Sequence, residues 1–485
     1  MDLLALTVTQ LADKVRSGDV KAADVARACL ARIAAVDPKV HAFLTISQES
    51  LTQAADAIDA KRARGDKLGK LAGVPVALKD ALCTRGIVSS SGSKIIEGYV
   101  PPYDATVVAR LKAEDALLPG KTNMDEFAMG SSTENSAYGP CKNPWDLART
   151  PGGSSGGSAA CVAARMTPAS LGSDTGGSIR QPAALTGTVG VKPTYGRVSR
   201  FGLIAFASSL DQIGPFASDV RGAARLLDVI AGRDPKDATS LDAAIEDWES
   251  SCERPVKGLK IGLPEEYFAA GLDPEVEASV RSAIAELERE GCTIVPVKMP
   301  HTKFAVATYY VVATAEASSN LARFDGIRYG HRVERSRDLK EIYGATRDQG
   351  FGVEVKRRIL LGTFVLSAGY YEAYYLKAQK VRTLIARDFE AAFANVDAIV
   401  CPTAPTPAFK LGEKTNDPLT MYLSDIYTLP ASLAGLPAIS VPCAPTKSGL
   451  PIGLQVITRA LDESTMFSIA ASVERHHPPL AAPIA

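Results

Sequence analysis

The stretch Pro151-Gly-Gly-Ser-Ser-Gly-Gly-Ser158 is followed a short way downstream by Leu171-Gly-Ser-Asp-Thr-Gly-Gly-Ser-Ile-Arg-Gln-Pro182. Glycine lets the backbone adopt unusual φ and ψ angles and lets other groups approach it closely. Composition alone allows a flexible linker here. A phosphate-binding P-loop is excluded, because no lysine follows either glycine pair of 151–158. The third interpretation is a catalytic loop built around a serine.

Ser178 follows Gly-Gly and precedes a region where we expect a helix to begin. Backbone N–H groups converge at such a position, so they can bind an oxyanion while the serine hydroxyl attacks the neighbouring carbonyl carbon. A serine hydroxyl is a weak nucleophile at neutral pH and needs a base, which is usually histidine. The five histidines lie outside this region without a motif around them, and we expect them to be surface or structural residues: His41, His301, His331, His476 and His477.

The alternative base is a lysine. The apolar run Leu71–Leu78 predicts a buried strand that ends at Lys79. A lysine serves as a base only where burial lowers its pKa toward neutrality. A single lysine at a strand end is typically solvated, but two Gly-Gly-Ser loops in the same chain favour Lys79 as the base.

Composition limits the class of protein. The chain has 485 residues, of which 46% are apolar and 22% charged, which suits one large α/β domain or several smaller ones. Lys plus Arg equals Asp plus Glu at 54 each, so the chain lacks the positive charge needed to bind nucleic acid unaided. Its eight scattered cysteines form no C-x-x-C pair and indicate reduced thiols. With a poor signal peptide and no long apolar stretch, we expect a cytoplasmic protein without membrane contact.

Strands alternate with helices along the chain, which predicts an α/β fold with a large mixed β-sheet core flanked by helices. The clearest unit joins a strand at Leu259–Leu263 to a strand at Cys292–Val297 through a helix capped by Asp273. Later strands are expected at Asp397–Val400 and Ala438–Val441. We expect one domain with a helical N-terminal arm (about 1–65), a Gly/Ser-rich catalytic core (about 66–215) and a remaining α/β part (about 216–485) that completes the sheet and the substrate pocket.

These residues resemble the amidase signature family, whose catalytic triad is Ser–Ser–Lys. The resemblance implies the amidase-signature fold. It also implies that Ser178 is the nucleophile that becomes acylated, that Ser154 is a bridging serine in a cis peptide, and that Lys79 is the base. The oxyanion hole is implied to be formed by the backbone N–H groups of Thr175, Gly176, Gly177 and Ser178.

Longer strings are similar to one subfamily, the glutaminase (A) subunits of the glutamyl-tRNA(Gln) amidotransferases. The similarity extends from about residue 8 to about residue 460. The similar strings are Gly120–Gly139, Lys192–Arg200, Ser318–Gly326 and Lys356–Phe364. Ala81 and Asp115 depart from the subfamily, which usually has Asn at the first position and Gly at the second.

The resemblance also implies a glutamine pocket. A free amino acid carries an ammonium and a carboxylate, so a selective pocket needs one acid and one base. The subfamily positions match Asp425 for the ammonium and Arg358 for the carboxylate, with Tyr309 lining the pocket. From the residues alone, Arg358 would be interpreted as part of a solvated helix face and Asp425 as a helix cap.

The implied activity is hydrolysis of glutamine, with ammonia supplied for the ATP-dependent conversion of Glu-tRNA(Gln) to Gln-tRNA(Gln) on a partner subunit. The implied assembly is a heterotrimer with a kinase and transamidase subunit (B) and a small subunit (C). Glu-tRNA(Gln), ATP and Mg are then held by the partner, and this chain binds no cofactor or metal. Two alternatives stay open: a free-standing amidase acting on small amides, and a non-catalytic scaffold. Whether Asp-tRNA(Asn) is also amidated is open as well.

Overall fold

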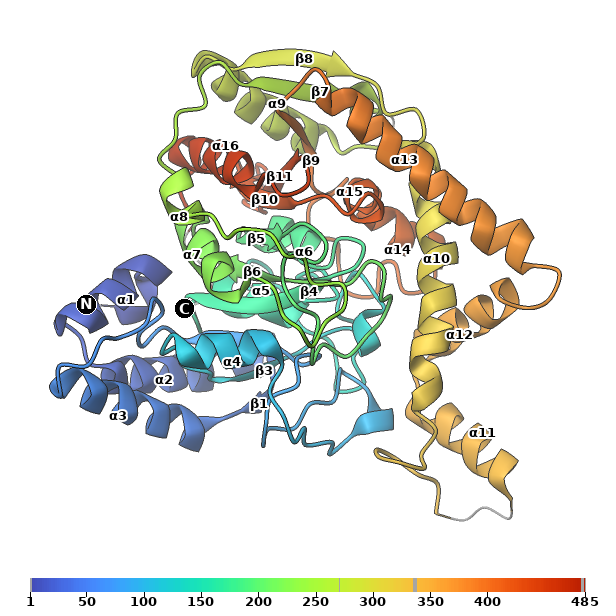
Figure 1. Cartoon of the computed structure of the whole chain (residues 1–485), viewed down its shortest axis with the longest axis horizontal. Coiled ribbons are helices and arrows are strands. Elements are labelled where there is room, and N and C mark those ends of the chain that lie inside the picture. The colour runs from blue at the N-terminus through green and yellow to red at the C-terminus, as the bar shows by residue number, and fades with distance from the viewer. Residues whose placement is uncertain (1, 270, 335–337, 481–483, 485) are drawn as a thin grey trace.

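An eleven-stranded mixed sheet runs through the described part of the chain, and helices surround it (Figure 1). This computed structural model describes residues 2–269, 271–334, 338–480 and 484. The strand order is β1-β3-β2-β4-β6-β5-β10-β11-β9-β7-β8, which confirms the expected α/β class. The strands are β1 (Phe43–Ile46), β2 (Val76–Lys79), β3 (Gly120–Thr122), β4 (Ala169–Asp174), β5 (Val189–Lys192), β6 (Gln212–Ala217), β7 (Lys260–Pro264), β8 (Thr293–Val297), β9 (Ala398–Pro402), β10 (Ala438–Cys443) and β11 (Ile452–Thr458).

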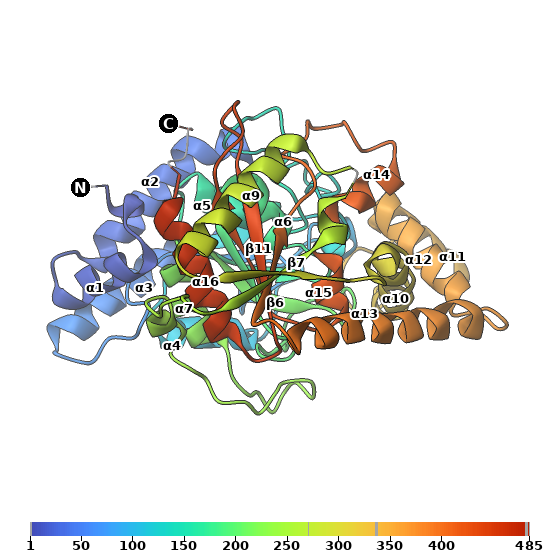
Figure 2. The same ribbon diagram turned by 90° about the horizontal axis from the view of Figure 1, so that it is seen from above.

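The first three helices lie together on one side of the molecule in both views, as expected for a helical N-terminal arm (Figures 1 and 2). Among the described residues, no helix has the length and apolar character needed to cross a bilayer. The helices are α1 (Val8–Ser17), α2 (Ala22–Val40), α3 (Gln48–Ala63), α4 (Thr106–Ala113), α5 (Gly156–Ala163), α6 (Arg180–Thr186), α7 (Val220–Ile230), α8 (Trp248–Ser251), α9 (Pro274–Arg289), α10 (Ala305–Asn320), α11 (Leu339–Gly350), α12 (Val353–Val365), α13 (Lys377–Phe393), α14 (Pro418–Tyr422), α15 (Leu429–Leu433) and α16 (Glu463–His476).

Strand β2 positions the candidate site, because it lies between β3 and β4 and runs parallel to both. The C-terminal ends of parallel strands meet at the same edge of a sheet, and the loops that follow them converge there. Lys79, Thr122 and Asp174 are the last residues of these three strands. The loops at this edge lead into the two glycine-rich segments; α5 begins at Gly156 within the first of them, and α6 begins at Arg180, two residues after Ser178.

Two local expectations are wrong. The apolar run Leu71–Leu78 is not one strand: β2 begins only at Val76, because Gly73 has a φ of +69° and the chain turns before it. The N-terminal arm is not wholly helical, since Phe43–Ile46 forms β1, an edge strand antiparallel to β3. A strand of four residues next to a long helix carries too little pattern to be recognised from its sequence.

The later βαβ unit is confirmed. Strands β7 and β8 are parallel, and α9 connects them. The Asp273 carboxylate accepts hydrogen bonds from the N–H groups of Glu275 and Val276 and so caps α9, with Pro274 at the first helical position. The strands expected at Asp397–Val400 and Ala438–Val441 correspond to β9 and β10, which flank β11.

The departure at Asp115 has a structural account. Asp115 has a φ of +59°, in the left-handed region that favours glycine. Its carboxylate accepts hydrogen bonds from the Lys61 amine at 2.8 Å and from the Gly69 N–H at 2.6 Å. These contacts offset the backbone strain, so an aspartate occupies a glycine position while keeping the turn before β3. Ala81, the other departure, is buried directly after the end of β2.

Helices α10 and α12 pack closely at Gly362, where a Cβ would lie 1.9 Å from the Thr314 carbonyl oxygen. We expect Gly362→Ala to lower the free energy of unfolding by about 2 kcal/mol, because the two helices must separate. The urea midpoint measures this effect. Gly344→Ala on exposed α11 is the control, since nothing lies within 4 Å of the added Cβ, and it should leave the midpoint equal or higher. Equal midpoints for Gly362→Ala and wild type would contradict the close packing.

Candidate active site

The Lys79 amine lies at the end of β2 with none of its surface exposed. Its Nζ is 2.7 Å from the Ser154 hydroxyl, 2.8 Å from the Ser155 hydroxyl and 3.0 Å from the Ser173 hydroxyl. The Ser173 carbonyl oxygen is 3.3 Å away. A charged lysine has three N–H donors and no acceptor, so it cannot satisfy four oxygens at once. A neutral amine has a lone pair that can accept a proton from one of the hydroxyls.

Burial lowers the pKa of Lys79 to about 7, although the negative charges of Asp125, Asp174 and Asp211 act in the opposite direction. None of these carboxylates is a hydrogen-bond partner of the amine in the described part of the chain. The amine is therefore partly neutral near pH 7, as a general base requires. This arrangement meets the expectation that Lys79 is desolvated.

The loop that carries Ser154 is held on several sides. The peptide bond between Gly153 and Ser154 is cis. The Asp125 N–H donates to the Ser154 carbonyl oxygen at 3.2 Å, and the Gly153 N–H donates to Gln181 Oε1 at 3.0 Å. A Cβ on Gly153 would lie 2.2 Å from Asp125 Oδ2. Only glycine fits before Ser154, which explains the Gly-Gly string at this point.

The turn Thr175–Ser178 is closed by a buried ion pair. Arg180 Nη2 and Nε donate to Asp174 at 2.9 and 3.0 Å, and the Ile179 N–H donates to the same carboxylate at 3.2 Å. Burial is the largest single effect and acts to raise the pKa of Asp174, but the Arg180 charge and hydrogen bonds, the Lys192 charge and the Ile179 N–H together hold that pKa below its usual value. Asp174 precedes the turn and Arg180 follows it, so the pair fixes both ends.

The backbone N–H groups of Thr175, Gly176, Gly177 and Ser178 donate no hydrogen bond within the described residues. The carbonyl groups of the turn, in contrast, are engaged: Gly176 accepts from the Thr428 hydroxyl at 2.6 Å, and Gly177 accepts from the Gln181 N–H at 2.8 Å. The turn is thus fixed through its acceptors while its donors stay free. Free, converging N–H groups can stabilise an oxyanion.

Ser178 lies beside the Lys79–Ser154 pair but is not joined to it by its hydroxyl. The Ser155 N–H donates to the Ser178 carbonyl oxygen at 3.3 Å, which brings the two serine loops together. Ser178 is 8% exposed, and its hydroxyl makes no hydrogen bond to any residue that the structure describes. The structure therefore places Lys79 and Ser154 in contact, and Ser178 next to them with a free hydroxyl.

Asp425 and Tyr309 adjoin the turn. A Cβ on Gly176 would lie 2.8 Å from the Tyr309 ring, and one on Gly177 would lie 3.2 Å from Asp425 Oδ1. Asp425 Oδ2 accepts a hydrogen bond from the Ser131 hydroxyl, while Oδ1 is buried without a partner among the described residues. Burial raises the pKa of Asp425 to about 7, against the effect of the Ser131 hydrogen bond. An unpaired buried carboxylate oxygen suits a cationic group of a ligand.

Arg358 lies inside the protein and not on a solvated helix face. It is 3% exposed, donates from Nε to Glu354 Oε1 at 2.8 Å, and packs 5.1 Å from the Tyr310 ring. Burial is the largest effect and opposes its charge, but Tyr310, Glu354, Tyr422 and Tyr309 together outweigh it and raise the pKa of Arg358. A cavity of about 130 Å³ adjoins it, with Ser132, Glu354, Lys414 and Tyr422 among the lining residues.

The sequence interpretation assigned no role to several residues that build this site. Asp174 and Arg180 flank the turn, and Ser155 and Ser173 contact the Lys79 amine. All four lie inside the quoted glycine-rich strings, and an acid and an arginine six residues apart around a turn are the signal that could have indicated them. Gln181, at the next position, had no such signal.

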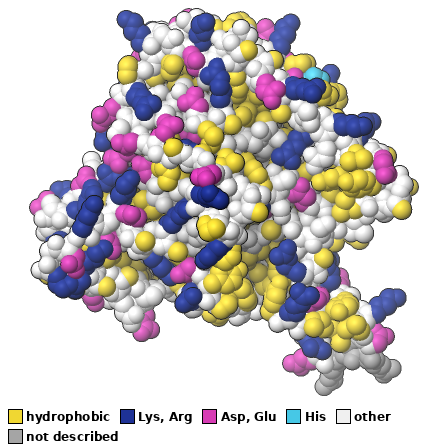
Figure 3. All heavy atoms as spheres, viewed as in Figure 1, with side chains coloured by type: hydrophobic (Ala, Val, Ile, Leu, Met, Phe, Trp, Pro, Cys, Tyr) yellow, Lys and Arg dark blue, Asp and Glu magenta, His cyan; other side chains and the backbone are white. Residues whose placement is uncertain are grey.

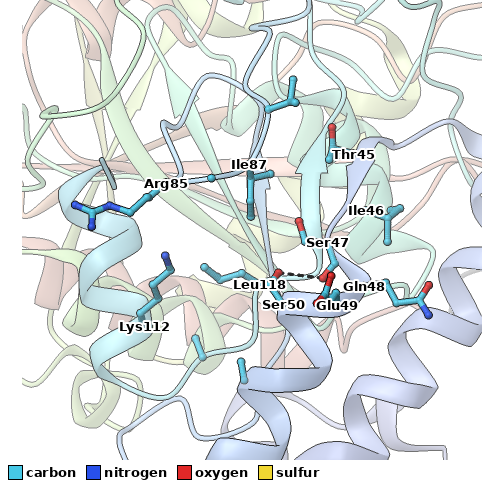
Figure 4. Close-up of a pocket in the computed structure, with 14 residues that line it drawn as sticks. Thr45, Ile46, Ser47, Gln48, Glu49, Ser50, Arg85, Ile87, Lys112 and Leu118 are labelled. Carbon is cyan, nitrogen blue, oxygen red and sulfur yellow. Dashed lines mark hydrogen bonds between the residues drawn. The ribbon is translucent and has the colours of Figure 1, made fainter. Parts of the chain in front are cut away.

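A larger cavity, of about 560 Å³, lies elsewhere, at the edge strand β1. Figure 4 shows Arg85 and Lys112 on one side of it and Ser47, Gln48 and Glu49 on the other. None of the expected site residues lines this cavity. The volume of a cavity therefore does not identify the candidate active site, which is identified by Lys79 and the Thr175–Ser178 turn.

The chain as a whole is similar to known proteins. The Amidase family model matches residues 24–467. The chain belongs to the amidase family. The resemblance noted in the sequence is thereby confirmed, and the glycine-rich strings and Lys79 all fall within the matched region.

Two A subunits of glutamyl-tRNA(Gln) amidotransferases are similar to the chain over nearly its whole length. The A subunit of the glutamyl-tRNA(Gln) amidotransferase of Myxococcus xanthus is 60% identical over 477 residues, which cover 98% of each protein. The structure of the corresponding A subunit from Thermotoga maritima is similar with a TM-score of 0.83 and 44% identity, covering 100% of this chain and 99% of that one. Another member of this fold, 6-aminohexanoate cyclic dimer hydrolase, has a TM-score of 0.84 and 27% identity, covering 99% and 98%.

The position of Lys79 in this amidase predicts the pH dependence of the reaction. With a simple amide such as propionamide, kcat/KM should rise with pH and reach half its maximum at about 7, because only the neutral amine accepts a proton. Propionamide is chosen because it has no ammonium to interact with Asp425. Initial rates of ammonia release over a pH series measure the profile.

A second buried lysine supplies the control. Burial also lowers the pKa of Lys192 on β5 to about 7. Lys192→Met should keep the acid limb at the same pH, whereas Lys79→Met should abolish the activity. An acid limb that disappears in Lys192→Met would show that Lys192, and not Lys79, is the titrating group.

Proposed function

We propose that this chain is the glutaminase subunit of a tRNA-dependent amidotransferase, with Lys79, Ser154 and Ser178 as its catalytic residues. The observation that carries the proposal is the buried Lys79 amine, which lies 2.7 Å from the Ser154 hydroxyl beside a turn whose four N–H groups have no acceptor among the described residues. The full-length similarity to amidotransferase A subunits supports the same activity.

The first half-reaction forms an ester on Ser178. Neutral Lys79 takes a proton from Ser154, and Ser154 takes one from Ser178 as the Ser178 oxygen bonds to the side-chain carbonyl carbon of glutamine. The negative charge that develops on the carbonyl oxygen is stabilised by the N–H groups of Thr175–Ser178. The carbon–nitrogen bond then breaks, the proton passes to nitrogen, and ammonia leaves.

The second half-reaction restores the serine. Water attacks the γ-glutamyl ester, gives a proton to the Ser154–Lys79 pair and releases glutamate, while the Ser178 oxygen regains a proton. The Ser178 hydroxyl turns toward Ser154 as substrate enters, because its side chain makes no competing hydrogen bond in the described structure. Catalytic hydrogen bonds commonly tighten only when substrate is bound.

Glutamine selection rests on two buried charges. The α-ammonium pairs with the free Oδ1 of Asp425 and thereby favours its ionised form, although burial raises the pKa of that residue to about 7. The α-carboxylate pairs with Arg358, whose remaining donors face the adjoining cavity, and Tyr309 lines the pocket. A buried carboxylate oxygen without a partner is costly, so the unpaired Oδ1 of Asp425 favours a substrate with an ammonium over a neutral amide.

The ammonia is consumed elsewhere, on a partner subunit that binds ATP, Mg and Glu-tRNA(Gln). The zero formal charge of this chain supports that division, because nothing in its composition favours RNA. We assign two partners, the kinase and transamidase subunit and a small subunit, in the cytoplasm. The eight cysteines, all free thiols, are compatible with a reducing compartment.

The surface also supports a partner. Large apolar side chains are exposed along α12 and the segment that leads to α13, and Figure 3 shows hydrophobic atoms gathered over this part of the molecule. Concentrated exposed apolar surface is typical of a protein interface. The exposed residues are Val353, Leu360, Leu361, Phe364, Tyr370, Tyr371, Tyr374 and Leu376.

The alternative function is a free-standing amidase. The fold itself permits it, since a cyclic-dimer hydrolase shares this architecture. The buried Asp425 favours glutamine instead, because a small neutral amide leaves its Oδ1 without a partner among the described residues, whereas Arg358 keeps its pairing with Glu354.

The test of the proposed function is Ser178→Ala in the complex with co-expressed partner subunits. With glutamine and ATP, formation of Gln-tRNA(Gln) should fall by about a thousandfold or more, because no ester can form. With ammonium chloride the variant should match wild type. A wild type that makes no Gln-tRNA(Gln) yet releases ammonia freely would establish the free-standing amidase instead.

The role of Asp425 is tested with Asp425→Asn. We expect KM for glutamine to rise about tenfold to a hundredfold, because an amide cannot pair with the ammonium, while propionamide kinetics stay within about twofold. The matched control is Asp417→Asn on the same segment, since asparagine also caps α14 and should leave both substrates unchanged. A glutamine KM unaffected in Asp425→Asn would rule out this ammonium site.

A further inference from the structure

Gln181 is fully buried on α6, three residues after Ser178, and the mechanism above gives it no role. A glutamine side chain offers one carbonyl acceptor and two N–H donors. Here the two ends of the amide contact two different loops. The backbone N–H of Gln181 itself donates to the Gly177 carbonyl oxygen at 2.8 Å, so the residue is also tied to the turn.

The acceptor end contacts the loop of the bridging serine. Gln181 Oε1 accepts from the Gly153 N–H at 3.0 Å, immediately before Ser154. The Gln181 side chain also packs closely against the preceding residue of this loop, because a Cβ on Gly152 would lie 2.4 Å from Gln181 Oε1. Gln181 therefore limits where the 152–154 backbone can lie, and with it the hydroxyl that meets Lys79.

The donor end contacts the wall of the glutamine pocket. Gln181 Nε2 donates to the Ser131 carbonyl oxygen at 2.9 Å. The hydroxyl of the same serine donates to Asp425 Oδ2, which leaves Oδ1 free to meet an ammonium. A continuous path of hydrogen bonds thus runs from the Asp425 carboxylate through Ser131 and Gln181 to Gly153.

The two loops are also joined independently of Gln181. The Thr150 hydroxyl donates to the Ser132 carbonyl oxygen at 2.7 Å, and the Thr133 hydroxyl donates to the Gly152 carbonyl oxygen at 2.8 Å. A change at Gln181 therefore alters the alignment of the loops while leaving them attached to each other.

We propose that Gln181 is a specificity-determining positioning residue that aligns the ammonium-binding carboxylate with the bridging serine, so that glutamine is hydrolysed in preference to amides without an α-ammonium. This inference rests on the proposed glutaminase function. The Gln181 side chain then sets the distance between the carboxylate that binds the substrate's ammonium and the serines that act on its amide. A misplacement there affects a substrate held at both ends more than one held only at the amide.

The experiment compares Gln181→Glu and Gln181→Met with wild type, each purified with its partner subunits, at about pH 9.5, because burial raises the pKa of a glutamate at this position above its usual value. Glutamate keeps the acceptor for Gly153 but cannot donate to Ser131 once ionised, so KM for glutamine should rise about tenfold with kcat little changed. Methionine loses both contacts, so kcat should fall as well. In both variants the ratio of kcat/KM for glutamine to that for propionamide should fall about tenfold.

Gln212 on β6 provides a matched control. It is equally buried, accepts from the Gly196 N–H at 2.7 Å and donates to the Val198 carbonyl oxygen at 2.9 Å, so its side chain contacts neither the Ser154 loop nor the Ser131 segment. Gln212→Met should lower Tm about as much as Gln181→Met does, yet keep the wild-type substrate ratio.

The outcomes separate the two proposals. A wild type that prefers glutamine, with folded Gln181 variants that keep the wild-type ratio, overturns the role of Gln181 alone. A ratio that falls equally in Gln212→Met also overturns it, because the effect is then a general loss of stability. A wild type without preference for glutamine removes the proposed function and this inference together.

Discussion

The Lys79 amine is enclosed by hydroxyl and carbonyl oxygens and not by an acid, and the rest of the site depends on this choice. A carboxylate in contact would hold the proton on the amine, whereas neutral oxygens satisfy it without favouring its charge. Asp125, Asp174 and Asp211 act only through their charges, and burial outweighs them. The cluster of serines around the end of β2 is therefore a requirement of the base as much as a source of nucleophiles.

The nearby charged groups pair with each other instead of with Lys79, as Arg180 and Asp174 do. Both are fully buried and satisfy each other through two hydrogen bonds, and Arg180 also donates to the Thr428 carbonyl oxygen at 2.9 Å. A buried pair of this kind adds little net stability but strongly restricts geometry. Its effect here is to hold a turn whose N–H groups point away from any internal acceptor in the described structure, an arrangement that an isolated glycine-rich loop would not maintain.

Much of this could be predicted, and the reasons differ by residue. The apolar run before Lys79 and the Gly-Gly-Ser strings are local patterns, so Lys79 could be predicted as a candidate base and Ser178 as a candidate nucleophile from the residues alone. The role of Ser154 came only from the resemblance to the family, and the α/β class from the alternation of strands and helices. Arg358 and Asp425 could not be located from local pattern, because a Lys-Arg-Arg string resembles a solvated helix face until α12 packs against α10. The role of Gln181 could not be predicted for the same reason, because its side chain contacts two loops that are distant in sequence. The β1 strand and the short extent of β2 were missed because a few residues and one glycine with a positive φ decide them.

The pairing of Arg180 with distant residues has a consequence for the order in which the protein is made. The serine loops are synthesised early, but Arg180 also binds Gln455 Oε1 at 2.7 Å, and β5 pairs with β10, so both wait for the last part of the chain. Nascent chains fold from the N-terminus as they emerge. A chain that ends before residue 428 can therefore form the Asp174–Arg180 pair, but it lacks the Thr428 and Gln455 contacts that also hold Arg180. The turn reaches its full set of contacts only when the last strands of the sheet are in place.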